Sequence, residues 1–235
     1  MLVTTFSGSK GGVGKTTLAI SLSIVSALQR IPTLLVDASA EGGATAYLLG
    51  NVEPPYLSAG DLQGALRRVA IQDVAPGSGV ELNVAVNRGP LRDVARVAEQ
   101  LRSLDSFPVV MVDIPALSDL DAMERYLPLL DAADAILTVA EPSTASIRSA
   151  TMYTFGSKRV VAALNCPRPY TQAVVDLYRR YMDIYARRCN ARYVVVPYSK
   201  AVSLLSSERL NILSYVEPAF VSAVTELARL LFSKK

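Results

Sequence analysis

The chain has 235 residues, of which 51% are hydrophobic and 19% are charged, and this composition suits a folded core and excludes a disordered chain. It contains no histidine, which excludes mechanisms that need an imidazole base or a histidine metal ligand. Its two cysteines, Cys166 and Cys189, lack the CxxC spacing of a zinc, iron–sulfur or redox site, so we expect them to be reduced and buried.

Charge is divided unevenly along the chain. Residues 1–145 carry 10 basic and 16 acidic residues, a net charge of −6, whereas residues 146–235 carry 14 and 5, a net charge of +9. A basic carboxyl-terminal part favours a polyanionic partner, although solubility alone can also explain such an asymmetry. The first residues lack the features of a secretory signal and no apolar run reaches the ~18 residues of a membrane span, so we expect a soluble, cytoplasmic protein.

Short runs rich in Val, Ile and Leu alternate with longer helical patterns along the whole chain. This alternation predicts an α/β fold with a doubly wound, mostly parallel sheet flanked by helices. We expect strands at 2–6, 32–36, 82–86, 109–112, 135–139, 160–164 and 193–196. We expect helices near 15–29, 90–103, 118–129, 145–153, 171–188, 201–207 and 217–233. No linker or repeat interrupts the alternation, which favours a single domain over residues 1–235.

A glycine-rich loop follows the first predicted strand and precedes the first predicted helix, as a P-loop does. In such loops backbone N–H groups surround phosphate oxygens, a lysine meets the β- and γ-phosphates, and a hydroxyl binds Mg²⁺. The general pattern has glycine where this chain has Ser9, so the match is inexact. The residues expected to surround the nucleotide are Lys10, Gly11, Gly12, Val13, Gly14, Lys15, Thr16 and Thr17.

The stretch from Lys10 to Thr17 resembles the deviant Walker A motif of the ParA/MinD family of ATPases, in which the early lysine reaches the partner's nucleotide across a dimer. The resemblance continues in the family's order through residues 34–50, 109–116, 132–134, 160–169 and 194–202. It implies a P-loop NTPase fold and a dimer that binds ATP with Mg²⁺. It also assigns Asn165 and Pro197 to two base-binding segments, although an asparagine at that position is also an ordinary turn former.

Two predicted strands are followed directly by an aspartate, and both carboxylates are candidates for holding Mg²⁺ together with Thr16. Asp113 ends the strand that resembles the family's Walker B segment, and Asp37 ends another strand of the same sheet. Each can hold the metal directly or through water, although a strand-terminal aspartate can also serve only to cap a turn.

The chain departs from the family pattern in the segment after Asp37. The family usually has a second aspartate, which orients the attacking water, at the position that Ser39 occupies here. A serine hydroxyl can hydrogen-bond to water but supplies no negative charge, so we expect hydrolysis that is weak or absent. Glu41 can substitute if its side chain swings in; the alternative is that Glu41 faces solvent. The residues assigned to catalysis are therefore Lys10, Lys15 and the degenerate Ser39.

The segment 171–193 predicts a helix whose apolar stripe consists of Val174, Leu177, Tyr178, Tyr181 and Tyr185. Asp176 with Arg180, and Asp183 with Arg187, have the i,i+4 spacing of helix-supporting pairs. Basic residues without such a partner are candidates for a face that binds DNA phosphates. They are Arg168, Arg179, Arg188, Arg192, Lys200 and Arg209.

These features lead to one principal functional hypothesis and two alternatives. The principal one is a ParA-like switch that forms a homodimer with ATP, binds double-stranded DNA without sequence preference, and acts with a partner protein in DNA segregation or positioning. One alternative is a catalytically silent nucleotide-binding adaptor that assembles a partner protein. The other is a MinD-like membrane-associated ATPase, which we do not favour because the last predicted helix has the pattern of a packed surface helix.

Overall fold

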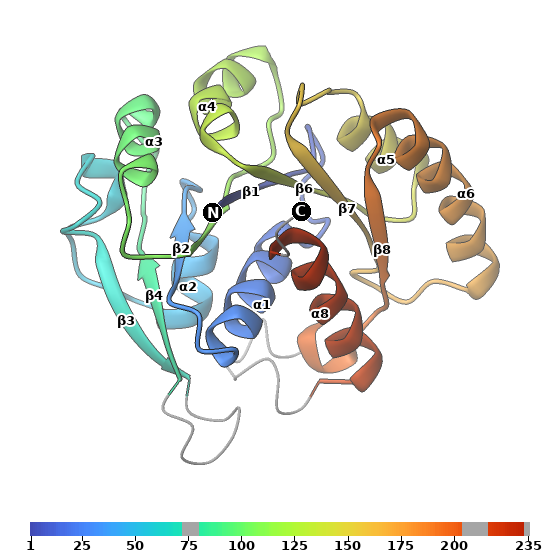
Figure 1. Cartoon of the computed structure of the whole chain (residues 1–235), viewed down its shortest axis with the longest axis horizontal. Helices are drawn as coiled ribbons and strands as arrows, with labels where there is room; N and C mark the ends of the chain where they lie inside the picture. The colour runs from blue at the N-terminus through green and yellow to red at the C-terminus, as the bar shows by residue number, and fades with distance from the viewer. Residues whose placement is uncertain (72–79, 204–215, 233–235) are drawn as a thin grey trace.

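Buried apolar strands form the centre of the fold in the computed structural model, which describes residues 1–71, 80–203 and 216–232. Eight strands form one sheet in the order β3-β4-β2-β5-β1-β6-β7-β8. β3 is antiparallel to β4, and the other neighbouring strands are parallel. Helices cover both faces, so the predicted doubly wound α/β fold is confirmed (Figure 1).

The strands are β1 (Leu2–Phe6), β2 (Thr33–Asp37), β3 (Leu66–Ile71), β4 (Val80–Ala85), β5 (Val109–Asp113), β6 (Ala135–Ala140), β7 (Arg159–Asn165) and β8 (Arg192–Val196). The helices are α1 (Lys15–Leu28), α2 (Gly43–Leu49), α3 (Val94–Arg102), α4 (Leu120–Ala132), α5 (Thr144–Thr151), α6 (Gln172–Cys189) and α8 (Pro218–Phe232), with a 3₁₀ turn at Leu57–Ala59. No helix in the described ranges is long and apolar enough to cross a membrane.

Two helical layers enclose the sheet, which explains why its central strands are continuous apolar runs rather than alternating ones. Every residue of β1, β2, β5 and β6 is buried. α1 and α8 pack together in the core on one face, whereas α3 and α4, and beside them α5 and α6, cover the other face (Figure 1). α8 is therefore a packed helix, as its pattern predicts.

Several predicted elements differ from the structure. Two elements were not predicted: β3, an edge strand with two arginines, and α2, which has only seven residues and starts after Gly42. α4 continues through Pro128 instead of ending near it. Only residues 201–203 of the helix expected at 201–207 are described, and they are helical, as is Lys200. The remainder lies outside the described residues, as do Arg209 and the end of the chain after 232.

The apolar stripe predicted for α6 is wrong in part. Val175, Met182 and Tyr185 are the buried residues of this helix, and Met182 and Tyr185 pack in one cluster with Ala162 and Leu164 of β7. Leu177 and Tyr181, which the prediction placed in the stripe, are each 47% exposed. The predicted i,i+4 ion pairs are also absent from the described residues; Asp176 pairs instead with Arg179, at 3.5 Å.

Candidate nucleotide-binding site

The loop between β1 and α1 lies at the carboxyl edge of the sheet and presents exposed backbone at Gly11 and Gly12. Gly12 and Gly14 have φ values of 72° and 92°, a region that favours glycine. A Cβ on Gly14 would also overlap the Asn165 amide, whereas a Cβ on Gly12 would meet no atom within 4 Å. Open loop backbone at the N-terminus of α1 is an arrangement that can surround a phosphate group.

Lys15, the first residue of α1, is buried beneath this loop and is only 7% exposed. Its Nζ donates a hydrogen bond to Ser7 Oγ at 3.0 Å, and Ser7 Oγ donates to the Lys10 carbonyl oxygen at 2.8 Å. Burial lowers the pKa of Lys15, and the nearby Asp113 carboxylate opposes that effect. The side chain of Lys10, by contrast, is at the surface. A phosphate beside Lys15 would stabilise its charged form.

Asp113 ends β5 directly beside Asp37, which ends β2, because these two residues are register partners in the sheet. Burial raises the pKa of Asp113 to about 6, and the Asp37 charge adds to the increase; hydrogen bonding from Thr16, the Lys15 charge and hydrogen bonding from Thr5 oppose it. The Thr5 hydroxyl donates to Asp113 Oδ1 at 3.2 Å. A nearby cation would stabilise the charged form of this buried carboxylate.

These oxygen groups fit Mg²⁺, which takes one or two carboxylates and completes its coordination with phosphate oxygens and water. Asp113 and Thr16 lie together beside the loop, which suits a shared ion. The described residues contain no group of three or more acidic or sulfur ligands, so a magnesium ion here would depend on the nucleotide for part of its coordination.

Asp37 is held by four hydrogen bonds within the protein. Oδ1 accepts from the backbone N–H of Ser39 at 3.1 Å and its hydroxyl at 2.8 Å, and Oδ2 accepts from the backbone N–H and hydroxyl of Thr45, both at 2.8 Å. Burial raises the pKa of Asp37, and these hydrogen bonds oppose the rise. Since a carboxylate has about four acceptor positions, Asp113 is better placed to hold a metal directly.

Ser39 is buried, and both hydrogen-bonding functions of its hydroxyl are used within the loop. Ser39 Oγ donates to Asp37 and accepts from the backbone N–H of Gly43 at 3.1 Å, so it satisfies a donor at the start of α2. The rest of the loop is also held: Asn87 Nδ2 donates to the Ser39 carbonyl at 2.7 Å, and the Tyr126 hydroxyl donates to the Ala38 carbonyl at 3.0 Å. Glu41 faces solvent in this arrangement.

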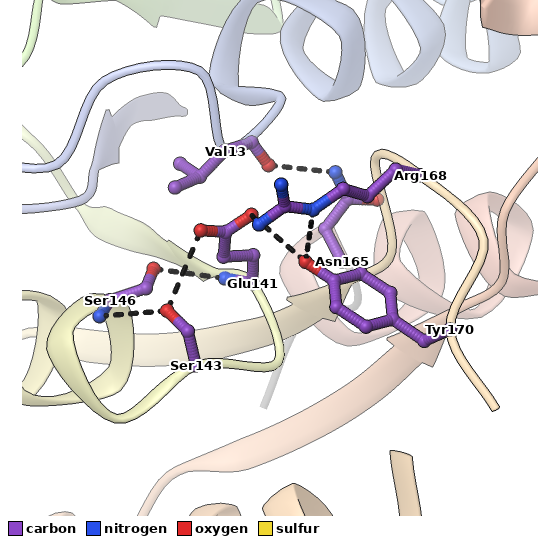
Figure 2. A network of polar contacts seen from close by, with 7 residues as sticks. All are labelled: Val13, Glu141, Ser143, Ser146, Asn165, Arg168 and Tyr170. Atoms are coloured by element: carbon purple, nitrogen blue, oxygen red, sulfur yellow. Dashed lines mark hydrogen bonds and ion pairs between the residues drawn. The ribbon is translucent and has the colours of Figure 1, made fainter. Parts of the chain in front are cut away.

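The segments expected to bind the base lie on the other side of the glycine-rich loop. A cavity of about 160 Å³ is lined by Gly12, Asn165 and Pro197, among other residues. Asn165 Nδ2 donates to the Val13 carbonyl oxygen at 2.7 Å, as Figure 2 shows. The amide nitrogen of Asn165 therefore already supports the loop, which leaves its carbonyl oxygen for other contacts.

A polar network around Glu141, which the sequence analysis missed, adjoins this segment (Figure 2). Glu141 directly follows β6 and is 6% exposed. Its Oε2 accepts from the Tyr170 hydroxyl at 3.0 Å and from the Arg168 guanidinium at 3.3 Å. The network fastens the turn that follows Asn165 to the turn that precedes α5. The sequence signal that could have identified Glu141 is its position directly after an apolar strand.

The described residues proposed for DNA binding do not form one continuous face. Arg168 and Lys200 follow the carboxyl ends of β7 and β8, and Arg168 is paired with Glu141. Arg192 begins β8 at the opposite edge of the sheet, where it lines a cavity with Lys158 and Arg159. Arg188 lies near that edge on α6, whereas Arg179 is paired with Asp176, contrary to the expectation that it lacks a partner.

The sheet order and the loop after β1 define a P-loop NTPase fold. The family described as the CobQ/CobB/MinD/ParA nucleotide binding domain matches residues 4–212, and the chain belongs to this family. A comparison with curated protein sequences gives no match.

Solved structures of low sequence identity share the fold. The cell division ATPase MinD of Pyrococcus furiosus has a TM-score of 0.74 at 19% identity, covering 97% of each chain. A variant of Cyanothece McdA in complex with ATP has a TM-score of 0.74 at 17% identity, covering 100% of this chain and 98% of the other. A ParA family ATPase from Chlorobium tepidum has a TM-score of 0.66 at 18% identity, covering 96% of each chain.

Proposed function

We propose that this chain acts as a single-domain switch that binds ATP with Mg²⁺, forms a homodimer in the ATP-bound state, and hydrolyses ATP weakly or not at all. We further propose that the dimer binds double-stranded DNA without sequence preference and acts with a partner protein in the cytoplasm, in DNA segregation or positioning. The names of the structural neighbours, which include a cell division ATPase and a ParA family ATPase, are consistent with positioning.

The observation that supports nucleotide binding is the position of Lys15 under an open glycine loop, next to Asp113 and Thr16. A buried ammonium beside a buried carboxylate whose pKa is raised to about 6 is costly for an isolated protein. Binding of a polyphosphate next to the lysine and of a magnesium ion next to the carboxylate would offset this free-energy cost. A nucleoside triphosphate such as ATP binds as its magnesium complex and so supplies the polyphosphate and the metal ion together.

Weak hydrolysis follows from the loop after β2. The Ser39 hydroxyl donates its proton to Asp37 and accepts from Gly43, so it is held within the loop and offers an attacking water no negative charge. Phosphoryl transfer depends on water positioning and electrostatics, and the remaining contributions come from Lys15, Mg²⁺ and the loop N–H groups. A slow residual rate is therefore the expected outcome.

The test of the nucleotide site compares two lysines of the same loop. Lys15→Ala should abolish ATP binding in calorimetry with Mg²⁺, because it removes the cation nearest the β- and γ-phosphates. Lys10→Ala is the matched variant: its side chain is exposed, so binding to the single chain should persist. Unchanged affinity in the Lys15 variant would reject the nucleotide assignment.

The dimer is tested by light scattering. The wild-type mass should double with ATP, and Lys10→Ala should stay monomeric, because two triphosphates brought close together need an additional cation between them. A mass that does not respond to ATP would reject the switch, and a Lys10→Ala dimer would reject the role of this lysine across the interface.

The adaptor function is the second candidate, and the satisfied Ser39 hydroxyl favours it. An adaptor would bind ATP and never turn it over, whereas a slow switch would show turnover that DNA or a partner increases. Measuring phosphate release with and without duplex DNA separates the two. ATP binding without phosphate release, either with or without DNA, would favour the adaptor.

A further inference from the structure

Exposed apolar side chains gather in two places on the helical layer that contains α4, α5 and α6. Among the described residues, six large apolar side chains are exposed, and all lie on these three helices or directly after α5. On α4 they are Leu120 and Leu127, at 73% and 42% exposure. On and beside α6 they are Met152, Leu177, Tyr181 and Ile184, at 47–71% exposure. Apolar side chains grouped on one surface indicate an interaction site more strongly than scattered ones do.

The α6 group forms a regular stripe with a basic border. Leu177, Tyr181, Ile184 and Arg188 stand at positions i, i+4, i+7 and i+11, the spacing at which a helix presents one face to another helix. Tyr181 and Ile184 also line a cavity of about 420 Å³ between α5 and α6, with Arg148 and Arg188 in its wall. Arg180 and Arg187 are exposed on the border of the stripe. We call this surface the basic groove.

The α4 group has the same spacing and the opposite charge. Leu120, Glu124, Leu127 and Asp131 stand at i, i+4, i+7 and i+11, and all four are exposed. The Glu124 and Asp131 carboxylates take part in none of the ion pairs between described residues; Arg102 and Lys158 donate instead to the Asp131 backbone carbonyl oxygen, at 2.9 and 2.8 Å. We call this surface the acidic ridge. The two leucines of the ridge and the pair Leu177 and Ile184 are both seven residues apart, about 10 Å along a helix.

We propose that the acidic ridge of one copy of this chain docks into the basic groove of a second copy. The two surfaces match in apolar spacing and are opposite in charge, which is the complementarity expected of helix-in-groove recognition. They also lie on different helices of the same layer, with α5 between α4 and α6 (Figure 1). Each copy therefore uses both surfaces with different neighbours, and the contact is head-to-tail.

A head-to-tail contact builds an open chain of copies unless its rotation closes a ring. Neither surface contains a residue of the glycine-rich loop, so the contact goes beyond the proposed nucleotide-dependent dimer and does not depend on it. Two helices bury less area than a standard stable interface, so we expect association in the range of tens to hundreds of micromolar.

The decisive experiment exchanges the charges of the two surfaces and measures mass by sedimentation without nucleotide. The first variant combines Glu124→Lys with Asp131→Lys, and the second combines Arg180→Glu with Arg187→Glu. Wild type should associate as concentration rises, and each variant alone should associate at least tenfold more weakly, because like charges then face each other. An equimolar mixture of the two variants should recover association, because each surface again meets its opposite.

Two controls keep the result specific to this contact. Glu53→Lys combined with Glu81→Lys makes the same change in net charge as the first variant, at exposed positions elsewhere, and should associate as wild type does. Ile184→Ser should weaken association without changing the charge, and circular dichroism should show that every variant is folded. A wild type that stays monomeric at 300 µM, charge-exchanged variants that associate normally, or a mixture that fails to recover would each overturn the proposal.

Discussion

Asn165 and Val13 are 152 residues apart in the chain, yet the Asn165 amide nitrogen donates a hydrogen bond of 2.7 Å to the Val13 carbonyl oxygen. This contact joins the end of β7 to the glycine-rich loop and fixes one wall of the small cavity beside it (Figure 2). The geometry of the loop therefore depends on a segment from the second half of the chain.

Asn165→Ala should lower the free energy of unfolding by about 1–2 kcal/mol, because it leaves the Val13 carbonyl without its partner. Asn165→Asp should be at least as damaging, since a carboxylate would then face a carbonyl oxygen. Urea denaturation measures both effects. ATP affinity should fall in parallel, and stability unchanged in both variants would mean that the contact does not support the loop.

Ser39→Asp should raise the rate of ATP hydrolysis several-fold while leaving ATP affinity nearly unchanged, because the added carboxylate acts on water rather than on the bound phosphates. The same change should lower stability, since the new carboxylate replaces a hydroxyl that donates to Asp37 at 2.8 Å.

Ser39→Ala is the control for that experiment. It should lower stability by about 1–2 kcal/mol through the lost hydrogen bonds to Asp37 and Gly43, with no gain in rate. If Ser39→Asp is no faster than wild type, then either the loop geometry has diverged beyond repair by one residue or Glu41 already supplies the missing carboxylate.

Asp113→Asn should stabilise the nucleotide-free protein at pH 8 and not at pH 4. The folded pKa of Asp113 is raised from 3.8 to about 6, so the folded state binds this proton more tightly than the unfolded state does. Stability from this group is therefore greatest below pH 4, falls as pH rises from 4 to 6, and stays reduced above pH 6. Asparagine avoids that cost, and the gain at pH 8 should be about 1–3 kcal/mol.

Thermal unfolding at the two pH values measures the difference. Adding Mg²⁺ and ATP should reverse the order of stability at pH 8, because only the wild type has a carboxylate to hold the metal. A variant that is less stable than wild type at both pH values would show that the Thr5 hydrogen bond to Asp113 outweighs the cost of burying its charge.

Combined replacement of Arg188 and Arg192 by alanine should flatten the dependence of DNA affinity on salt. Each lost phosphate contact lowers the slope of log affinity against log salt by roughly one unit. Filter binding with ATP measures the slope. Arg92→Ala with Arg96→Ala removes the same charge from exposed positions near and on α3 and should leave the slope unchanged. If wild type retains no DNA at low salt with ATP, the basic residues are only solvated surface.

The sequence predicted the fold and the composition of the loop after β1 because both depend on local patterns. Buried parallel strands are continuous apolar runs, and glycines beside a lysine and two threonines leave few alternatives at the start of a helix. The pattern also places Asp113 and Asp37 at one edge of the sheet, because parallel strands end at the same edge, and the strand order makes them direct neighbours.

Contacts between distant segments were not visible in the sequence. The face that α6 buries depends on Ala162 and Leu164 of β7, against which Met182 and Tyr185 pack while Leu177 and Tyr181 stay exposed. The role of Ser39 as a partner of Gly43, and of Glu141 as a partner of Tyr170, depends on turns that no periodicity describes. The pair of threonines inside the apolar strand β1 was an available signal, since Thr5 bonds to Asp113.

The loops of the candidate site are fastened largely by serine and threonine hydroxyls, including those of Ser7, Ser39, Thr45 and Ser149. A hydroxyl neither gains nor loses a proton in the range in which proteins are stable, and the chain has no histidine to titrate near neutrality. The framework of the site should therefore be the same in a buffer of pH 6.5 and in one of pH 9. Dependence of nucleotide binding on pH within that interval would then report the charged groups that meet the ligand, namely Lys15, whose pKa is lowered by burial, and Asp113, whose pKa is raised to about 6, together with the nucleotide itself.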